Sequence, residues 1–342
     1  MKLPLRFDNS MKMIPFSQIR SVVIFRRNGL GDILCSIPLV LRCKELMPQA
    51  HISLCIEEKN RDLAPYLQGP DEVVLIAQRK NKYLEMALTI WPLRKRGIDI
   101  GISAKTTPMK LINRSLLALG AKYRIAYVEK KRDWCVNCPV PNSLPTTHQA
   151  LRAIHLIDPQ MDQLEPAYYP QLRRVGKVEL FSPTTLLVSV SNNRAGSTIS
   201  PSRYATFLNA LAGIPSLGII VNCLPKDRPQ AEELVKRLQI PNHVYPTETL
   251  GDFLALLNSV DGVFTGDGGI VHLASALHKP LVALYGGTKP WEWGPLNSQA
   301  TVLSHEHHVD EIDTGQIVNA LHQLTRRPSF CFGNSVVALI NK

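Results

Sequence analysis

The sequence lacks both a long apolar segment and an ordered set of cysteines. No stretch of its 342 residues reaches 18 consecutive apolar residues, and no apolar core with a small-residue cleavage site follows the basic N-terminus. Its seven cysteines are an odd, scattered set, which argues against a disulfide framework. We therefore expect a cytoplasmic protein in a reducing compartment that does not cross the membrane.

Acidic residues are also comparatively few. The 28 Asp and Glu residues face 39 Lys and Arg residues, which gives a formal net charge of +11. This excess indicates an anionic partner, such as a phosphate, a nucleic acid or an anionic membrane surface. Helix-turn-helix and zinc-finger spacings are missing, and so are aromatic residues interleaved with basic ones, so we expect no nucleic acid partner.

What the sequence does contain is an alternation of short β-rich runs with longer amphipathic segments, which is typical of βαβ units. The predicted strands are residues 21–25, 51–56, 73–76, 98–102, 124–128, 186–190, 218–221, 262–265 and 281–284. A proline-rich stretch interrupts the alternation at 156–183. We predict an α/β protein of two doubly wound domains, residues 1–165 and 166–342. Ligands are then expected at the carboxyl ends of the strands.

The first candidate site is the Asn28-Gly29-Leu30-Gly31-Asp32 turn, which follows the first predicted strand and precedes an apolar helix. Glycines allow a tight turn there, and the helix start offers backbone N–H groups to an anion. Asp32 has two interpretations. It can cap the helix, or it can take a proton from a substrate hydroxyl.

Two further glycine turns follow predicted strands in the second half. In Thr265-Gly266-Asp267-Gly268-Gly269, the glycines have no side chains and leave the backbone N–H groups at the helix start accessible, which favours a diphosphate site. His272 lies about one turn further along the helix. A single histidine is more often a packed side chain. In Tyr285-Gly286-Gly287-Thr288-Lys289, the glycines and proline can simply form a turn, or Thr288 and Lys289 can contact a phosphate or sugar.

A basic stretch from Lys105 to Asp133 is the best candidate for holding an acidic acceptor, although a solvated helix face would explain part of it. Its basic residues are Lys105, Lys110, Arg114, Lys122, Arg124, Lys130, Lys131 and Arg132. Cys135 and Cys138 form a single CxxC with no second pair, so we expect two thiols and no metal.

At these residues the sequence resembles glycosyltransferase family 9, the ADP-heptose:lipopolysaccharide heptosyltransferases. Two segments carry most of the resemblance, VVIFRRNGLGDILCSIPLVLRCKELMPQAHI and FTGDGGIVHLASALHKPLVALYGGTKPWEWGPL. A third, SAKTTPMKLINRSLLALGAKYRIAY, is similar to the segment ending in the family's Gly-Ala-Lys-x-Arg.

The resemblance implies a GT-B fold of two facing Rossmann-like domains, with the acceptor on the N-terminal domain and the nucleotide sugar on the C-terminal one. It also implies an inverting transfer without a metal or other cofactor. Asp32 matches the family's general base, and Asp267, Gly268, Gly269 and His272 match the donor site.

Three further positions bear on the donor. Glu232 falls within a residue of the family's ribose-binding acid. Gly268 stands where the family commonly has Ser or Thr, and Ser197 stands where inner-core transferases carry Lys, so Arg194 is the cation that could replace that lysine.

We therefore expect transfer of heptose from ADP-heptose to an anionic lipopolysaccharide core, with possible peripheral association at the cytoplasmic face of the inner membrane. The alternatives are a family member that uses another nucleotide sugar and a catalytically silent glycan-binding protein. An NAD-dependent enzyme is a poor third, because neither glycine cluster reads GxGxxG with an acid about 20 residues on.

Overall fold

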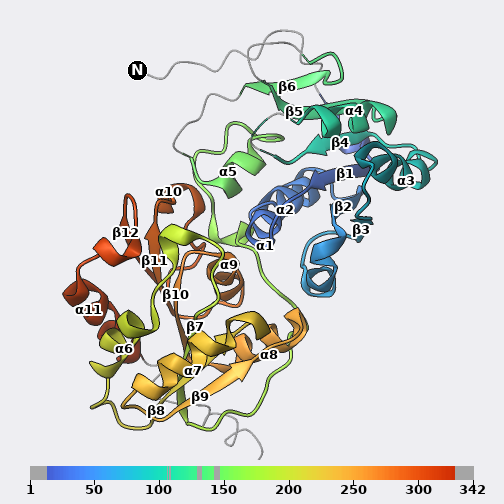
Figure 1. Cartoon of the computed structure of the whole chain (residues 1–342). Helices are drawn as coiled ribbons and strands as arrows, with labels where there is room; N and C mark the ends of the chain where they lie inside the picture. Colours follow the sequence, from blue (N-terminus) through green and yellow to red (C-terminus); the bar gives the residue numbers. More distant parts are fainter. Residues whose placement is uncertain (1–13, 106, 108, 129–132, 142–146, 328–342) are drawn as a thin grey trace, which may run out of the picture. The chain divides into compact units, whose positions relative to one another are not determined.

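The computed structural model describes residues 14–105, 107, 109–128, 133–141 and 147–327 (Figure 1). These fall into two compact units, one ending at Pro170 and the other beginning at Gln171. The sequence-based division was placed at 165/166. Each unit is an α/β domain built on its own parallel sheet.

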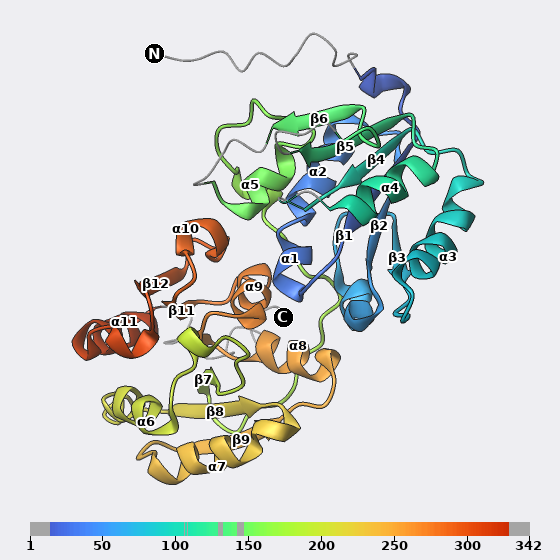
Figure 2. The same ribbon diagram turned by 45° about the horizontal axis from the view of Figure 1, so that its top comes forward.

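The N-terminal unit contains a six-stranded parallel sheet with the strand order β3-β2-β1-β4-β5-β6 (Figure 2). Its strands are β1 (Ser21–Arg26), β2 (His51–Glu57), β3 (Glu72–Ile76), β4 (Ile100–Ser103), β5 (Tyr123–Val128) and β6 (Cys138–Pro141). Its helices are α1 (Leu30–Leu34), α2 (Ile37–Leu46), α3 (Lys82–Arg94), α4 (Lys110–Ala118) and α5 (Gln149–Ile154), with 3₁₀ turns η1 (Phe16–Gln18), η2 (Glu58–Tyr66) and η3 (Pro166–Tyr168).

Helices cover both faces of this sheet, which explains why β1 is a continuous apolar run rather than an alternating one. Its residues are buried from Val22 onward. One face carries α3 and α4, whose Met86, Ile90 and Leu116 pack with Phe25 of β1. The other face carries α2 and α5, which lie against each other (Figure 1).

The C-terminal unit repeats this plan with the strand order β12-β11-β10-β7-β8-β9. Its strands are β7 (Thr184–Ser189), β8 (Leu217–Cys223), β9 (Asn242–Pro246), β10 (Gly262–Gly266), β11 (Leu281–Gly286) and β12 (Ala300–His305). Its helices are α6 (Pro201–Asn209), α7 (Arg228–Arg237), α8 (Leu250–Ser259), α9 (Gly269–Ala276), α10 (Pro290–Trp293) and α11 (Thr314–Thr325), with 3₁₀ turns η4 (Ala195–Ser197), η5 (Pro225–Asp227) and η6 (Val309–Glu311).

The strand orders determine where each unit can bind a ligand. In the first sheet the order reverses between β1 and β4, and in the second it reverses between β7 and β10. Crevices outside the carboxyl ends of strands at such switch points are the usual binding sites of doubly wound sheets. The residues that follow β1 and β4, and those that follow β7 and β10, therefore deserve the closest attention.

Candidate functional site

Asp32 lies at the switch point of the first sheet, in the first turn of α1. Its side chain is 23% exposed. The Asp32 Oδ1 atom accepts a hydrogen bond from the Arg26 guanidinium at 2.7 Å, and Oδ2 accepts one from the Gly29 N–H at 3.4 Å. The carboxylate thus closes the helix turn and keeps an accessible edge, so the two interpretations of this residue coexist.

The turn differs from the sequence-based expectation in one respect. Gly29 has an extended backbone (φ −85°, ψ 178°), whereas the left-handed conformation falls on Asn28, with φ of 102°. Asparagine tolerates this region better than most residues. Asn60 stabilises the turn, because its amide donates to the Asn28 carbonyl oxygen at 2.7 Å.

Arg26 is the partner that the sequence did not reveal. It is 3% exposed, and it donates to the Ala104 carbonyl oxygen, at the end of β4, as well as to Asp32. Burial lowers the pKa of this guanidinium, and the charge of Asp32 opposes that shift. The Arg26 guanidinium therefore links the ends of β1 and β4 and also holds the Asp32 carboxylate.

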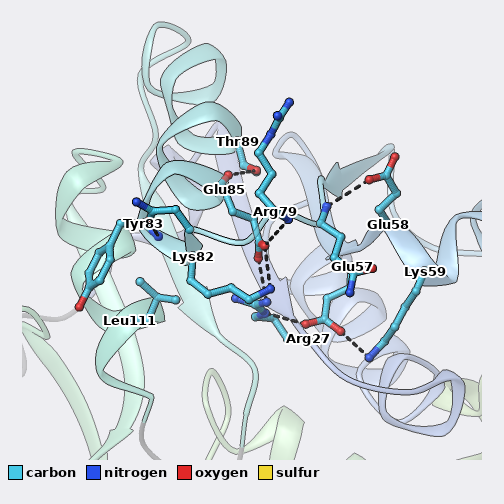
Figure 3. A network of polar contacts seen from close by, with 12 residues as sticks. Arg27, Glu57, Glu58, Lys59, Arg79, Lys82, Tyr83, Glu85, Thr89 and Leu111 are labelled. Atoms are coloured by element: carbon cyan, nitrogen blue, oxygen red, sulfur yellow. Dashed lines mark hydrogen bonds and ion pairs between the residues drawn. The ribbon is translucent and has the colours of Figure 1, made fainter.

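A second charged cluster lies at the carboxyl ends of β1, β2 and β3 (Figure 3). Arg27 joins two acids, donating to Glu57 and to Glu85, each at 2.8 Å. Lys59 pairs with Glu57 at 2.7 Å, and Lys82 pairs with Glu85 at 2.9 Å. These five side chains, with Ile76 and Gln78, line a pocket of about 90 Å³.

Glu85 anchors this pocket to α3 and is 1% exposed. Burial opposes ionisation of its carboxyl, but hydrogen bonds from Lys82 and from the Arg79 N–H, together with the charge of Arg27, hold its pKa below the usual range. The pocket therefore combines three cations with two ionised carboxylates, an excess of positive charge at the carboxyl edge of the sheet.

The basic stretch predicted from the sequence does not gather into one surface. Lys105 follows β4 directly, near the Arg26 contact, whereas Arg114 lies on α4 and donates to the Tyr83 hydroxyl of α3 at 3.4 Å. Lys122 and Arg124 lie at the amino end of β5, where Lys122 pairs with Asp99 at 2.7 Å. Lys130, Lys131 and Arg132 lie outside the described residues.

In the C-terminal unit, the loops after β7 and β10 form a compact polar cluster. Arg194 donates through Nη1 to Asp267 Oδ2 at 2.6 Å and to Thr288 Oγ1 at 2.8 Å. Asn192 donates through Nδ2 to the carbonyl oxygens of Asp267 and Ser197, both at 3.0 Å. Three residues predicted from separate motifs, Arg194, Asp267 and Thr288, are thus brought into direct contact.

Asp267 is fully buried, and its Oδ1 atom has no hydrogen-bond partner among the described residues. Burial raises the pKa of this carboxyl, while the Arg194 charge and the Thr288 hydroxyl oppose the shift. Burying a carboxylate with an unsatisfied oxygen costs free energy, which makes Asp267 a candidate for a functional role.

The glycines of this cluster have different functions. A Cβ at Gly266 would overlap the Ser197 carbonyl oxygen, and one at Gly286 would overlap that of Gly196, so both glycines allow close packing of backbone against η4. Gly268 caps α9 with an extended backbone, and a Cβ there would meet only Asn192 Oδ1 at 3.9 Å. Gly269 is the first residue of α9.

His272 and Glu232 differ in how they relate to this cluster. His272 lies on α9 and is 7% exposed, with its ring edge-to-face against Trp293 at 6.4 Å between centroids. Glu232 lies on α7, and its ion-pair partner in the described structure is Arg228 at 2.9 Å. The structure does not bring Glu232 into contact with Arg194 or Asp267.

Ser197 is one of the positions that differ from the family pattern. Its side chain is 1% exposed, and the hydroxyl bridges the peptide groups of Gly286, accepting from N at 3.2 Å and donating to O at 3.3 Å. The serine is therefore a structural brace between η4 and β11. Arg194 supplies a cation in this region.

Cys135 and Cys138 are buried, and burial raises the pKa of both thiols. Cys138 begins β6. The described part of the chain contains no group of three or more His, Cys, Asp or Glu side chains placed to hold a metal ion. In the same residues, no helix is both long and apolar enough to span a bilayer.

Comparison with known proteins supports the family resemblance seen in the sequence. Residues 203–322 match the model of glycosyltransferase family 9 (heptosyltransferase), a segment that contains Asp267, His272 and Thr288. The chain is also 23% identical over 310 residues to the lipopolysaccharide core heptosyltransferase OpsX of Haemophilus influenzae, which covers 83% of this chain and 84% of that protein. The resemblance to glycosyltransferase family 9 is thus supported by the family model over residues 203–322 and by this relative over most of the chain. It is a glycosyltransferase, as the sequence predicts.

Solved structures of similar proteins have the same fold as this chain. The Escherichia coli ADP-heptose lipopolysaccharide heptosyltransferase II superposes with a TM-score of 0.70 at 18% identity, covering 89% of this chain and 98% of that one. The E. coli heptosyltransferase WaaC, solved with ADP, gives a TM-score of 0.67 at 14% identity, covering 89% and 99%. The predicted GT-B fold is confirmed.

Proposed function

We propose that this glycosyltransferase transfers heptose from ADP-heptose to a hydroxyl of an anionic lipopolysaccharide core, by an inverting mechanism that needs no metal. The observation that carries the proposal is the contact of Arg194 with Asp267 and Thr288 beside the glycine start of α9. Asp267, Thr288 and α9 lie inside the segment that matches the family model. The names of the OpsX and WaaC relatives support the donor and acceptor classes.

The C-terminal cluster provides what a nucleoside diphosphate requires. The first N–H groups of α9 have no partners within the helix and point towards its N-terminus, and Arg194 supplies a cation beside them. As the sugar leaves the donor, negative charge grows on the diphosphate, and these groups with His272 would stabilise it electrostatically. Glu232 remains our proposal for the ribose hydroxyls.

Asp32 is proposed as the general base. Its carboxylate would take the proton of the acceptor hydroxyl while the hydroxyl oxygen bonds to the anomeric carbon, opposite the departing ADP. The bond between that carbon and the diphosphate oxygen breaks in the same step, so the configuration inverts. The Arg26 contact holds the accepting oxygen in one orientation.

We propose that acceptor anions bind along the carboxyl edge of the first sheet. Lys105 after β4 and the cations Arg27, Lys59 and Lys82 of the pocket are the described residues suited to this role. Arg114, Lys130, Lys131 and Arg132 remain proposals for the same acceptor. The enzyme would then work in the cytoplasm, at the inner face of the inner membrane.

A nucleotide screen tests this function. ADP should raise the melting temperature of the protein, whereas UDP, GDP, CDP and NAD should leave it nearly unchanged, because only a bound ligand stabilises the native state. Release of ADP from ADP-heptose in the presence of a lipopolysaccharide core oligosaccharide should follow. Selective stabilisation by another nucleotide would assign a different donor sugar, an outcome consistent with Gly268 and Ser197. Binding of ADP without transfer would indicate a silent glycan-binding protein.

A further inference from the structure

The most unusual surface of the N-terminal unit is the outer face of α3. Large apolar side chains that are substantially exposed are few in the described chain, and half of those recorded lie on this one helix. They are Tyr83 (64% exposed), Leu84 (49%), Leu88 (49%) and Trp91 (66%). Exposed apolar groups scattered singly need no explanation, but a contiguous group indicates an interaction surface.

The spacing places these side chains together. Leu84, Leu88 and Trp91 are separated by four and three residues, so they form one stripe along the helix. The opposite face is occupied, since Met86 and Ile90 pack against the sheet. The helix therefore has apolar residues on both sides, one covered by its own domain and one open.

Positive charge flanks this stripe at both ends. Residues 78–97 contain six cations and a single carboxylate, that of the buried Glu85. The cations are Arg79, Lys80 and Lys82 before the stripe and Arg94, Lys95 and Arg96 after it. Lys82 is paired with Glu85 and Arg96 with Glu72, so the charge offered to a partner comes mainly from the other four. Lys95 extends back over the Trp91 ring, with 5.8 Å between its Nζ atom and the ring centroid.

We infer that α3 is a membrane-docking helix that lies on an anionic lipid bilayer. An apolar stripe with tryptophan and leucine, flanked by basic residues, is the composition of helices that lie in the plane of the interface. The flanking cations match the negative surface potential of anionic lipids. A protein partner would have to supply an apolar groove with acids at both ends, whereas a bilayer supplies both features at any point of its surface.

This docking would also position the pocket. Lys82 and Glu85 of α3 are pocket residues, so the pocket lies at the amino end of the docked helix (Figure 3). An acceptor anchored in the bilayer would then present its anionic groups close to the membrane surface, where the pocket lies. This step rests on the proposed function, whereas lipid binding by α3 does not.

Vesicle sedimentation of the full chain tests the inference. The protein should sediment with vesicles containing phosphatidylglycerol and not with phosphatidylcholine vesicles. The triple variant Leu84→Ser/Leu88→Ser/Trp91→Ser should bind at least about 100-fold more weakly, because it removes most of the apolar contact. Lys80→Ser/Lys95→Ser should lose about 10- to 30-fold and become less sensitive to salt. Trp134→Ser, which alters an exposed tryptophan elsewhere, is the matched control.

A spectroscopic arm reports which face touches lipid. The chain has four tryptophans, and brominated phosphatidylglycerol quenches only those that enter the bilayer. Trp91→Phe should keep sedimenting but lose most of the quenching. Quenching that persists in this variant, or sedimentation of the triple variant like the wild type, would refute the inference. So would a wild type that binds neither vesicle.

Two further outcomes separate this inference from its rivals. If the wild type is a dimer that the triple variant converts to a monomer without any lipid binding, α3 is an interface between copies of the chain. Transfer to a delipidated core oligosaccharide should be equal in the triple variant and the wild type. Absence of that transfer in both proteins would count against the proposed function and leave the vesicle result standing.

Discussion

The carboxylate of Asp32 divides its two oxygens between two tasks. Oδ2 accepts the Gly29 N–H and closes the first turn of α1, while Oδ1 faces the Arg26 guanidinium. Because the side chain is only 23% exposed, it cannot reorient freely. A base that must meet one hydroxyl in one direction benefits from this restraint.

Replacing Asp32 by Asn should separate the two tasks. The amide oxygen can still accept the Gly29 N–H, whereas the buried Arg26 guanidinium loses its anionic partner. We therefore expect a variant that is less stable but still folds and binds ADP. Transfer should fall by roughly 10²–10⁴, the usual scale for loss of a general base. Steady-state kinetics and calorimetric titration with ADP would measure the two effects.

The control for this variant is Asp62→Asn, which removes an exposed carboxylate from η2. It should leave kcat and ADP affinity as in the wild type. If Asp32→Asn also turned over normally, Asp32 would be a helix cap and the proposed base would have to be another residue.

Asp267 presents the reverse case, a carboxylate whose ionisation the fold disfavours. Burial raises its pKa, and the Arg194 charge only partly compensates. Between the unfolded and the raised folded pKa, the native state binds more protons than the unfolded state, so stability falls as pH rises through this window. Asp267→Asn should lack this slope and be more stable than the wild type at neutral pH.

Urea unfolding of both proteins from pH 4 upward would measure this difference, with Asp252→Asn, a change in an exposed helix cap, as a comparison. Asp267→Asn should at the same time bind ADP more weakly, because the ion pair with Asp267 no longer holds the Arg194 guanidinium in position beside the start of α9. A variant that is less stable at neutral pH, with the wild-type pH slope, would show that the carboxylate stabilises the fold.

At the scale of single elements, the β10–α9 turn shows why its glycines are not equivalent. Gly266→Ala forces a Cβ into the Ser197 carbonyl, and backbone cannot move aside as a flexible side chain can. We expect a loss of about 3 kcal/mol in the free energy of unfolding. Gly268→Ala, two residues on, should change stability by less than about 0.5 kcal/mol, since its backbone is extended and its surroundings are open.

Thermal and urea unfolding of the pair would distinguish the roles of the two glycines. Equal destabilisation would mean that Gly268 is also a packing glycine. Gly268→Ser restores the hydroxyl that the family commonly has there, and on the donor-site proposal it should bind ADP at least as tightly as the wild type.

The sequence predicted the central strands and the glycine turns because these have strong local signals. Buried parallel strands such as β1 read as continuous apolar runs, and α9, which follows β10, begins at a glycine. The edge strands β6, β9 and β12 were not predicted. β6 is only Cys-Pro-Val-Pro, and proline is tolerated because an edge strand needs fewer N–H donors.

Helix α3 escaped sequence analysis for a related reason. Apolar residues at 84, 88 and 91 fill the face that a surface helix normally leaves polar, so no 3.6-residue period stands out, and Pro92 lies inside the helix. The apolar residues on the exposed face of α3, which obscure the helical period, are the same residues that indicate membrane docking. Likewise Arg26 and Asn192 read as ordinary polar residues until strand pairing brings Ala104 and Asp267 beside them.

At the scale of the whole molecule, two similar sheets have acquired different chemistry at equivalent places. The switch point of the first sheet carries Asp32 with the charged pocket beside it, and that of the second carries Arg194 and Asp267 beside a helix start. The order of the motifs along the sequence already indicates that the two domains carry different binding residues. It does not indicate which loops lie next to each other, since that depends on the strand order.

The division predicts separate ligand footprints, which hydrogen exchange can measure. ADP should slow amide exchange in residues 190–198, 265–272 and 286–289, because a ligand suppresses local opening around its own site. A delipidated core oligosaccharide should slow exchange in residues 26–32, 57–59 and 78–82. His272→Ala should weaken the ADP footprint, by about 1.5–3 kcal/mol in affinity if a hydrogen bond to the charged diphosphate is lost, and leave the acceptor footprint intact. Protection by ADP around Asp32 without protection around Asp267 would reverse the assignment of the two units, since each switch point would then hold the other ligand.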